Sequence, residues 1–346
     1  MWKEEQNNGK RQKNQYAGYW IRRFLCEYLV SVKNMSANTQ KSYRDTFRLL
    51  LARTSARLRK SVDILLLEDL SPQLIKEFLL YLEEDRGCSV RTRNQRLAAV
   101  YALAKYVAMQ SPEHVEWCRN IRAVPIKKAS KKLISYLEKD EMQRLLEFPN
   151  RKTEQGWRDY VLLLFLYNTG ARAEEASAIR ARDISVQKGR NGLSVVTITG
   201  KGRKTRRCPL WKKTSDAIAT LIRGKNDDTP VFCNRLGEQI TRFGVYEMVR
   251  RYAENLESQF PELKQKRISP HTIRHTCATH LLQSGVDINT IRAWLGHVSV
   301  NTTNIYAEVN MEMKVKALLA CETVVGKGKT VKWKDDKGLM AFLDSL

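Results

Sequence analysis

Apolar residues recur at helical spacing along the first third of the chain. The stretch YWIRRFLCEYLV, residues 19–30, places apolar side chains at 19, 20, 24, 25, 28 and 29, which predicts a helix with one buried face. Three more stretches with this spacing follow, with Ser36, Ser71 and Ser89 as expected N-caps and Gly87 as an expected helix end. We therefore expect a small all-α domain over residues 18–117.

The helical spacing is lost on either side of this domain. Residues 1–17 are polar and predict an N-terminal extension. Residues 118–133, CRNIRAVPIKKASKKL, are basic and have no apolar period. This composition predicts an extended linker that can lie along DNA phosphates.

Helical spacing returns in a second domain, predicted over residues 134–322, which includes one small sheet. LSVVTIT at 193–199 is β-branched and has no helical period, so it predicts a strand. The glycines that follow predict a hairpin turn into a second short strand, and VFC at 231–233 is a candidate third strand. Residues 242–320 read as helical again. The expected fold class is mainly α with a small β-sheet, α+β, in two domains.

Charge narrows the class of partner. The chain has 61 Lys and Arg against 37 Asp and Glu, a net charge of +24. A lysine-rich solvated surface would usually carry matching acids, so this surplus favours a polyanionic partner, of which nucleic acid is the commonest. The longest apolar run, residues 161–167, is too short to span a bilayer, and the N-terminus lacks the apolar core of a signal peptide. We expect an intracellular protein with no membrane partner.

The cysteines and histidines predict neither disulfides nor metal. The seven cysteines are scattered, odd in number and without a CxxC pair, which favours reduced core thiols. His271 and His275 are four residues apart, but no glutamate follows the first and no third ligand is apparent. We expect no metal and no cofactor.

Five short motifs in the second domain carry candidate chemistry. They are TGARAEE with Arg172 and Glu175, TGKGRK with Lys201, HTIRH with His271 and Arg274, WLGH with His297, and TTNIY with Tyr306. Each alone has a simpler interpretation. The first is typical of an intrahelical salt bridge, the second of an ordinary hairpin turn, and the tyrosine of a packed aromatic.

In this order and spacing the motifs resemble those of the tyrosine recombinase (phage integrase) family, which includes Xer-like recombinases and mobile-element integrases. The resemblance covers about residues 18–322 and departs only slightly, with Ala171 where a larger aliphatic residue is common. It implies a SAM-like α-helical core-binding domain and a catalytic domain that close on DNA as a C-shaped clamp.

The resemblance also implies roles for the motif residues. Tyr306 would attack a phosphodiester and form a 3′-phosphotyrosyl link, which preserves the bond energy without a cofactor. Tyrosine has a pKa of about 10, so proton transfer needs help, with Lys201 as the acid for the leaving oxygen and His271 assisting at the tyrosine. The clamp on the non-bridging oxygens would consist of Arg172, Arg274 and His297, with Glu175 in a supporting role.

The implied partners are double-stranded DNA with two recombination sites and three further copies of the chain in a homotetramer, with related recombinases as possible partners. Recombination would pass through a Holliday junction and serve integration, excision or transposition in a bacterial cytoplasm, at the nucleoid. The tail, residues 323–346, ends in LMAFLDSL, whose apolar stripe predicts a short helix, and the resemblance favours its docking on the neighbouring subunit. The basic residues expected to contact DNA are Arg91, Arg93, Lys127, Lys128, Lys131, Lys132, Lys204, Arg206 and Arg207.

Two other functions use the same features. A type IB topoisomerase would share the chemistry but relax supercoils as a monomer. A DNA-binding regulator would keep the fold without cutting. The complete set of motif residues disfavours the regulator, and the N-terminal helical domain together with the C-terminal extension favours the recombinase.

Overall fold

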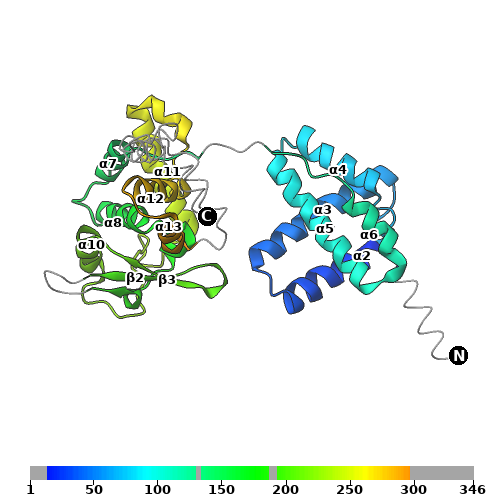
Figure 1. The fold of residues 1–346 in the computed structure, drawn as a ribbon, viewed down its shortest axis with the longest axis horizontal. Helices are drawn as coiled ribbons and strands as arrows, with labels where there is room; N and C mark the ends of the chain where they lie inside the picture. The colour runs from blue at the N-terminus through cyan, green and yellow to red at the C-terminus, as the bar shows by residue number, and fades with distance from the viewer. Residues whose placement is uncertain (1–13, 130–133, 187–192, 297–346) are drawn as a thin grey trace, which may run out of the picture. The chain divides into compact units, whose positions relative to one another are not determined.

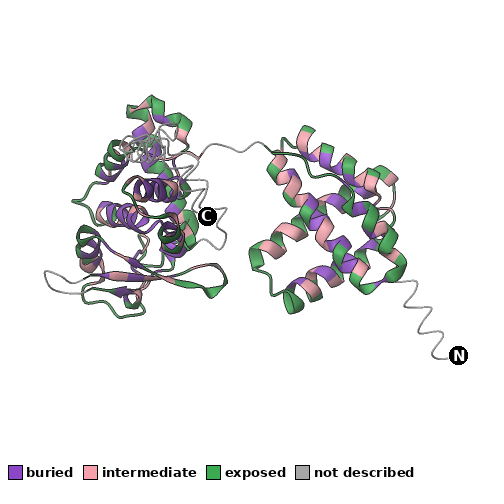
Figure 2. Ribbon diagram, in the orientation of Figure 1, coloured by how far each residue is buried: buried purple, intermediate pink, exposed green. Residues whose placement is uncertain are grey.

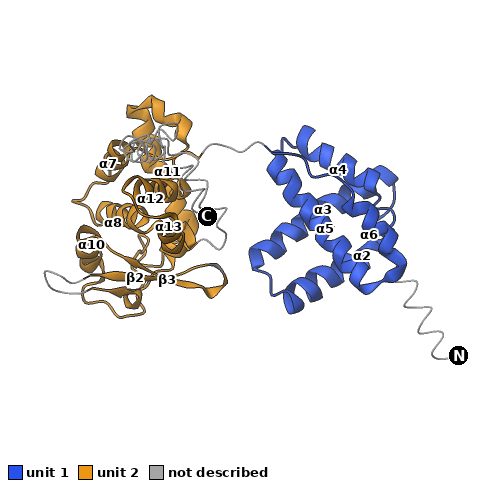
Figure 3. Cartoon of the chain, in the orientation of Figure 1, with its two compact units in different colours: residues 1–131 blue, residues 132–346 orange. Residues whose placement is uncertain are grey.

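The computed structural model describes residues 14–129, 134–186 and 193–296. The chain forms two units, residues 1–131 and 132–346 (Figure 3). The first is helical, and the second combines helices with a three-stranded sheet (Figure 1). The predicted fold class, mainly α with a small sheet, is confirmed. Among the described helices, none has both the length and the apolar character needed to cross a bilayer.

The first unit is built from helices whose caps the sequence predicted. Ser71 and Ser89 accept hydrogen bonds from the backbone N–H groups of Leu74 and Thr92, and Ser36 caps its helix in the same way. The helical segments are α2 (Ala17–Arg23), the π-helical continuation η1 (Phe24–Val32), α3 (Ala37–Leu58), α4 (Pro72–Glu84), α5 (Val90–Gln110) and α6 (Val115–Arg122).

The core of the first unit reaches further along the chain than predicted. Trp20, Phe24 and Phe47 belong to this core and are fully buried. On and just after α6, the side chains of Cys118, Ile121 and Val124 are also buried. The prediction of an extended linker from residue 118 is therefore wrong for 118–124, where three apolar residues spaced three apart pack a short helix against the core.

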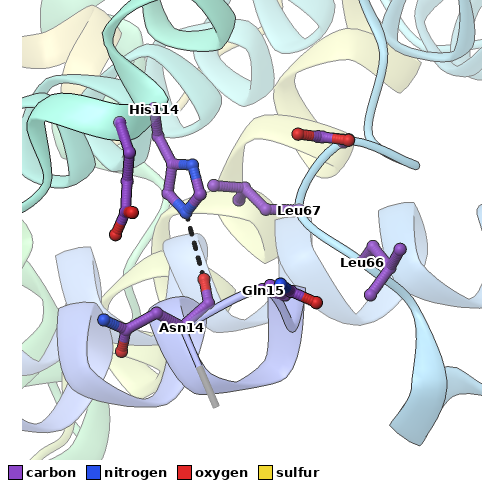
Figure 4. Close-up of a pocket in the computed structure, with 7 residues that line it drawn as sticks. Asn14, Gln15, Leu66, Leu67 and His114 are labelled. Carbon is purple, nitrogen blue, oxygen red and sulfur yellow. Dashed lines mark hydrogen bonds between the residues drawn. The ribbon is translucent and has the colours of Figure 1, made fainter. Parts of the chain in front are cut away.

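The start of the described chain is also attached to this unit. The Asn14 carbonyl accepts a hydrogen bond from Trp20 Nε1 at 2.7 Å and lies 3.1 Å from His114 Nε2, at the edge of a small pocket (Figure 4). Tyr16 pairs with Leu66 in a β-bridge, and Ala17 is fully buried. The predicted polar extension is therefore incorrect for residues 14–17, which form part of the packed unit.

Two neighbouring side chains of α5 hold the segment that leaves the first unit. Arg93, 8% exposed, donates from Nη1 to the Pro125 carbonyl at 3.0 Å. Asn94 donates to the Lys127 carbonyl at 2.7 Å and accepts from the Lys127 N–H at 3.2 Å. Residues 125–127 are thus fixed along α5 by their backbone.

The second unit contains a hairpin where the sequence predicted one. Strands β1 (Ile184–Ser185), β2 (Val195–Thr199) and β3 (Thr205–Pro209) form an antiparallel sheet in the order β1-β2-β3, with Thr199 opposite Thr205 at the hairpin end. The prediction of a third strand at 231–233 is wrong, because the third strand of the sheet is β1, beside β2. Around residues 231–233 the chain makes only isolated bridges, Arg180 with Pro230 and Cys233 with Gln239.

Helix α8 (Glu154–Thr169) forms the centre of the second unit. Its residues 160–166 are all buried, as expected for a helix that is apolar on every face (Figure 2). It packs against α10 (Lys212–Ile222) and α12 (Pro270–Gln283), while α13 (Ile288–Leu295) contacts β3 (Figure 1). The other α-helices described in this unit are α7 (Lys139–Glu147), α9 (Ala173–Ser177) and α11 (Arg242–Gln259).

Candidate active site

The TGARAEE motif forms the turn between α8 and α9. Gly170 ends α8 with φ +59°, and a Cβ there would lie 2.5 Å from Leu295 Cδ2, so only glycine fits the turn without strain. Arg172 caps α9, and its backbone N–H and Nη1 donate to the two carboxylate oxygens of Glu175 at 3.0 and 2.7 Å. The expected Arg172–Glu175 ion pair is present. The Arg172 side chain is 44% exposed, so it can meet a ligand from solvent.

Glu175 binds a second arginine. Arg206 Nη2 donates to Glu175 Oε2 at 2.7 Å, and the carboxylate is buried between the two guanidinium groups. Burial alone would raise the pKa of Glu175. The hydrogen bond and charge of Arg206, together with the backbone and side chain of Arg172, outweigh burial and hold that pKa below its usual value. Glu175 is therefore a charged, fixed centre for two arginines.

The TGKGRK motif forms the turn of the β2–β3 hairpin. The Gly200 N–H donates to the Lys204 carbonyl at 2.8 Å, and Gly202 has φ +76°. A Cβ at Gly200 would lie 3.0 Å from Glu175 Oε1, so the base of the hairpin rests against the Glu175 carboxylate. The backbone of Lys201 therefore starts directly beside the Arg172–Glu175 pair, while its side chain lies outside the described part of the structure.

Arg274 joins two further motifs. Its side chain is 2% exposed, and it donates from Nη1 to the Gly170 carbonyl at 2.5 Å and from Nη2 to the Leu295 carbonyl at 2.7 Å. Gly170 belongs to the turn before Arg172, and Leu295 ends the helix before residue 297. A buried arginine of α12 thus binds the TGARAEE turn and the WLGH turn together.

The two histidines of HTIRH lie side by side on α12. His271 is exposed, and its ring meets that of His275 edge to face with 4.4 Å between centroids. Burial, with the nearby His271 and Arg274, lowers the pKa of His275 to about 4, so this ring is neutral at neutral pH. The described residues contain no cluster of three or more His, Cys, Asp or Glu side chains that could hold a metal ion.

Two buried thiols lie in the same region. Cys208 Sγ on β3 is 3.4 Å from the Trp294 carbonyl, and burial raises its pKa. Cys277 on α12 is also buried, which raises its pKa to about 12. Core thiols were expected, and the expectation holds for these two and Cys118, whereas Cys26 is exposed.

The structure brings together Arg172, Glu175, Arg274 and the Lys201 turn through the contacts above. His297 and Tyr306 lie outside the described residues, as do Lys131, Lys132 and the tail, residues 323–346. Of the expected DNA contacts, five are exposed: Arg91, Lys127, Lys128, Lys204 and Arg207.

Two of the expected DNA contacts need correction. Arg93 is buried and holds the Pro125 carbonyl, and the Arg206 side chain is 9% exposed and bonds Glu175 and the Trp294 carbonyl. Both side chains lie largely inside the protein and donate to protein acceptors, so neither is the surface phosphate contact that was expected. Strand alternation was the available signal for Arg206, since it lies on the same face of β3 as the buried Cys208.

Comparisons with known proteins agree with this arrangement. Residues 135–313 match the model of the phage integrase family, and residues 21–111 match its N-terminal SAM-like domain. A putative integrase/recombinase, y4rC, from Sinorhizobium fredii is 36% identical over 93% of this chain and 96% of its own length.

Two solved structures share the fold. The XerH site-specific recombinase bound to a palindromic difH substrate is 23% identical with a TM-score of 0.61, covering 88% of this chain and 95% of its own. The Tn1549 transposon integrase in complex with a circular intermediate DNA is 17% identical with a TM-score of 0.66, covering 87% and 99%.

Proposed function

The chain belongs to the phage integrase family of tyrosine recombinases, and on this premise we propose that it cuts and rejoins DNA at specific sites through a 3′-phosphotyrosyl intermediate. The observation that carries the proposal is the double contact of Arg274. It binds the turn before Arg172 and the turn before His297, and so gathers residues more than a hundred positions apart around one point.

The proposed chemistry exchanges one ester for another. The Tyr306 oxygen forms a bond to phosphorus while the bond to the 5′-oxygen breaks. The proton lost by the tyrosine passes toward His271, and Lys201 supplies one to the departing 5′-oxygen. Religation reverses these transfers, with a 5′-hydroxyl from the same or a partner duplex as the attacking group.

The arginines would stabilise the transition state. The pentavalent phosphorus places added negative charge on the non-bridging oxygens, which planar guanidinium groups match well. Arg172 is exposed but fixed by Glu175, and Arg274 places a second positive charge at the buried junction of the Gly170 and Leu295 turns. With His297 as a third donor, each such group is expected to contribute about 3 kcal/mol to lowering the barrier.

Both units take part in DNA binding in this proposal. The exposed basic residues named above supply phosphate contacts from the helical unit, the segment that leaves it and the hairpin. We propose a homotetramer on two duplexes acting at the bacterial nucleoid, in the cytoplasm, because breaking and exchanging strands of two sites requires two active subunits on each. Similarity to y4rC along 93% of the chain, including the helical unit, favours this function over topoisomerase or regulator.

Trapping the covalent intermediate tests the proposal. The protein is incubated with a pool of nicked duplexes whose sequence around the nick is random, so that cleavage releases a short fragment and prevents religation. We expect a denaturation-resistant DNA adduct that survives excess EDTA, and sequencing the trapped DNA then gives the site. Tyr306→Phe should bind the selected DNA within about threefold of wild type and form no adduct, because the ring and the basic surface remain. An adduct in Tyr306→Phe, or none in wild type on the sequences it binds, would contradict the proposal.

A further inference from the structure

Arg206 lies on the inward face of β3 and reaches two other elements. Its Nη2 donates to Glu175 Oε2 at 2.7 Å, and its Nε donates to the Trp294 carbonyl at 2.8 Å. The next residue, Arg207, is exposed, as expected for alternate residues of a strand. The two neighbouring arginines therefore have the same charge and opposite surroundings.

The stem of Arg206 also supports the end of α13. Gly296 has φ +66°, and a Cβ there would lie 3.1 Å from Arg206 Cδ, closer than ordinary van der Waals contact. The arginine thus packs directly under the backbone turn from which residue 297 continues. The Arg206 side chain therefore links β3 of the hairpin to the Arg172–Glu175 pair and to this turn.

We propose that Arg206 is a positioning residue for strand cleavage, which holds the Lys201 hairpin in register with the Arg172–Glu175 pair and the turn before His297. This inference rests on the proposed function, because the reaction it serves is cleavage by Tyr306. Arg206 acts through the elements it fastens, since its side chain is 9% exposed and its Nε and Nη2 donate to protein acceptors.

The guanidinium is suited to this role by its shape. Its Nε and Nη2 point in fixed, different directions, so one group bonds a carboxylate of α9 and a carbonyl of α13 together. A lysine keeps the charge beside Glu175 but has a single ammonium nitrogen. Arg206→Lys should therefore retain the ion pair and lose the tie to Trp294.

The step most sensitive to Arg206 is protonation of the leaving group, because the hairpin carries Lys201 between Gly200 and Gly202. A displaced lysine would slow departure of the 5′-oxygen. A substrate with sulfur in place of that oxygen does not need a proton from Lys201, since a thiol has a pKa of about 8.5 and leaves as the thiolate. Loss through hairpin displacement should be restored by the sulfur substrate.

The experiment compares single-turnover cleavage of the trapped site with oxygen or sulfur at the 5′-bridging position. Arg206→Gln should cleave the oxygen substrate about 100-fold more slowly than wild type and the sulfur substrate within about fivefold. Arg206→Lys should show a smaller loss with the same restoration. Arg250→Gln is the matched control, because Arg250 is an exposed arginine of α11 paired with Glu247 and Glu254; it should cleave both substrates within about threefold of wild type.

The outcomes separate this inference from the function beneath it. If wild type forms no adduct, the proposed function fails. If wild type is active and Arg206→Gln cleaves the oxygen substrate at the rate of Arg250→Gln, only the positioning role is wrong. Equal losses on both substrates in Arg206→Lys, with an unchanged Tm, would also overturn it, because the hairpin would not be the element affected.

Discussion

The helical unit and the catalytic unit each bury an arginine that donates to backbone carbonyls, but the two arginines hold different kinds of chain. Arg93 bonds the Pro125 carbonyl and secures a segment that leaves its unit. Arg274 bonds the Gly170 and Leu295 carbonyls and secures two turns of the proposed active site. Their exposed fractions are similar, 8% and 2%.

This comparison shows what burial of an arginine does and does not indicate. Taking a guanidinium out of water is costly unless its donors are satisfied, so each buried arginine must have acceptors placed for it. The carbonyl acceptors explain how each side chain is held. What each buried arginine contributes depends on the residues next to its acceptors. Arg172 and residue 297 follow the acceptors of Arg274, and both belong to the proposed active site. Lys127 follows the acceptor of Arg93 and is an expected DNA contact.

The sharpest test exchanges each arginine for glutamine. Arg274→Gln should lower single-turnover cleavage at least about 100-fold on saturating DNA, because a transition-state charge is lost and two turns are released. Arg93→Gln should cleave within about threefold. Both should unfold more easily, by about 1–3 kcal/mol per carbonyl left without a donor, as measured by urea denaturation.

A similar cleavage loss in both variants would erase the distinction between the two anchors. The control is a thermal melt of each variant, which must show a Tm above the assay temperature. A protein that is unfolded during the assay would lose cleavage for an uninformative reason. Arg274→Lys, which retains charge, would then show whether charge alone restores any rate.

A second test compares two glycines, one in each unit, that have the same backbone conformation but different surroundings. Gly170 and Gly87 have nearly equal angles, φ +59° and +58°, but a Cβ at 170 would lie 2.5 Å from Leu295 Cδ2, while at 87 nothing lies within 4 Å. Gly87→Ala should cost about 1 kcal/mol from the left-handed backbone alone. Gly170→Ala should cost about 3 kcal/mol or more, because a side chain must also move. Equal losses in urea denaturation would mean that the turn yields easily.

The smallest effect concerns His275, next to Arg274. Its pKa in the folded protein is about 4, below the ordinary value near 6.5. Between these values the unfolded chain binds a proton that the folded chain does not, so stability falls as pH falls from about 6.5 to about 4. His275→Asn should lessen this decline relative to wild type, measured as Tm against pH. An identical pH dependence would show that burial does not lower the pKa of His275 in the folded protein.

Local features of this fold could be predicted from sequence, because they depend on neighbours along the chain. The serine caps, the hairpin at Gly200 and the buried helix α8 follow from adjacent residues. Tertiary partners could not be predicted this way. VFC reads as a strand, yet β1 takes the place beside β2. The end of α6 was hidden by the basic residues around its buried Cys118 and Ile121.

The candidate site divides in the same way. Motif order identified Arg172, Glu175 and Arg274, and the structure joins them to the hairpin that carries Lys201. Sequence alone assigned Arg206 to DNA, because a basic residue in a basic hairpin is typical of a phosphate contact. Its real partners, Glu175 and the Trp294 carbonyl, are 31 and 88 residues away and become neighbours only on folding.

The buried thiols Cys208 and Cys277 can report when the packing of the catalytic unit opens, through their reaction with an alkylating reagent. A thiol whose pKa is about 12, as burial makes that of Cys277, has almost no reactive thiolate at neutral pH, and Cys208 is shifted in the same direction. Alkylation at these two positions must wait until the surrounding packing opens, whereas exposed Cys26 can react at once. Their labelling rates relative to Cys26 therefore time the opening of the junction that Arg274 holds, without any engineered cysteine.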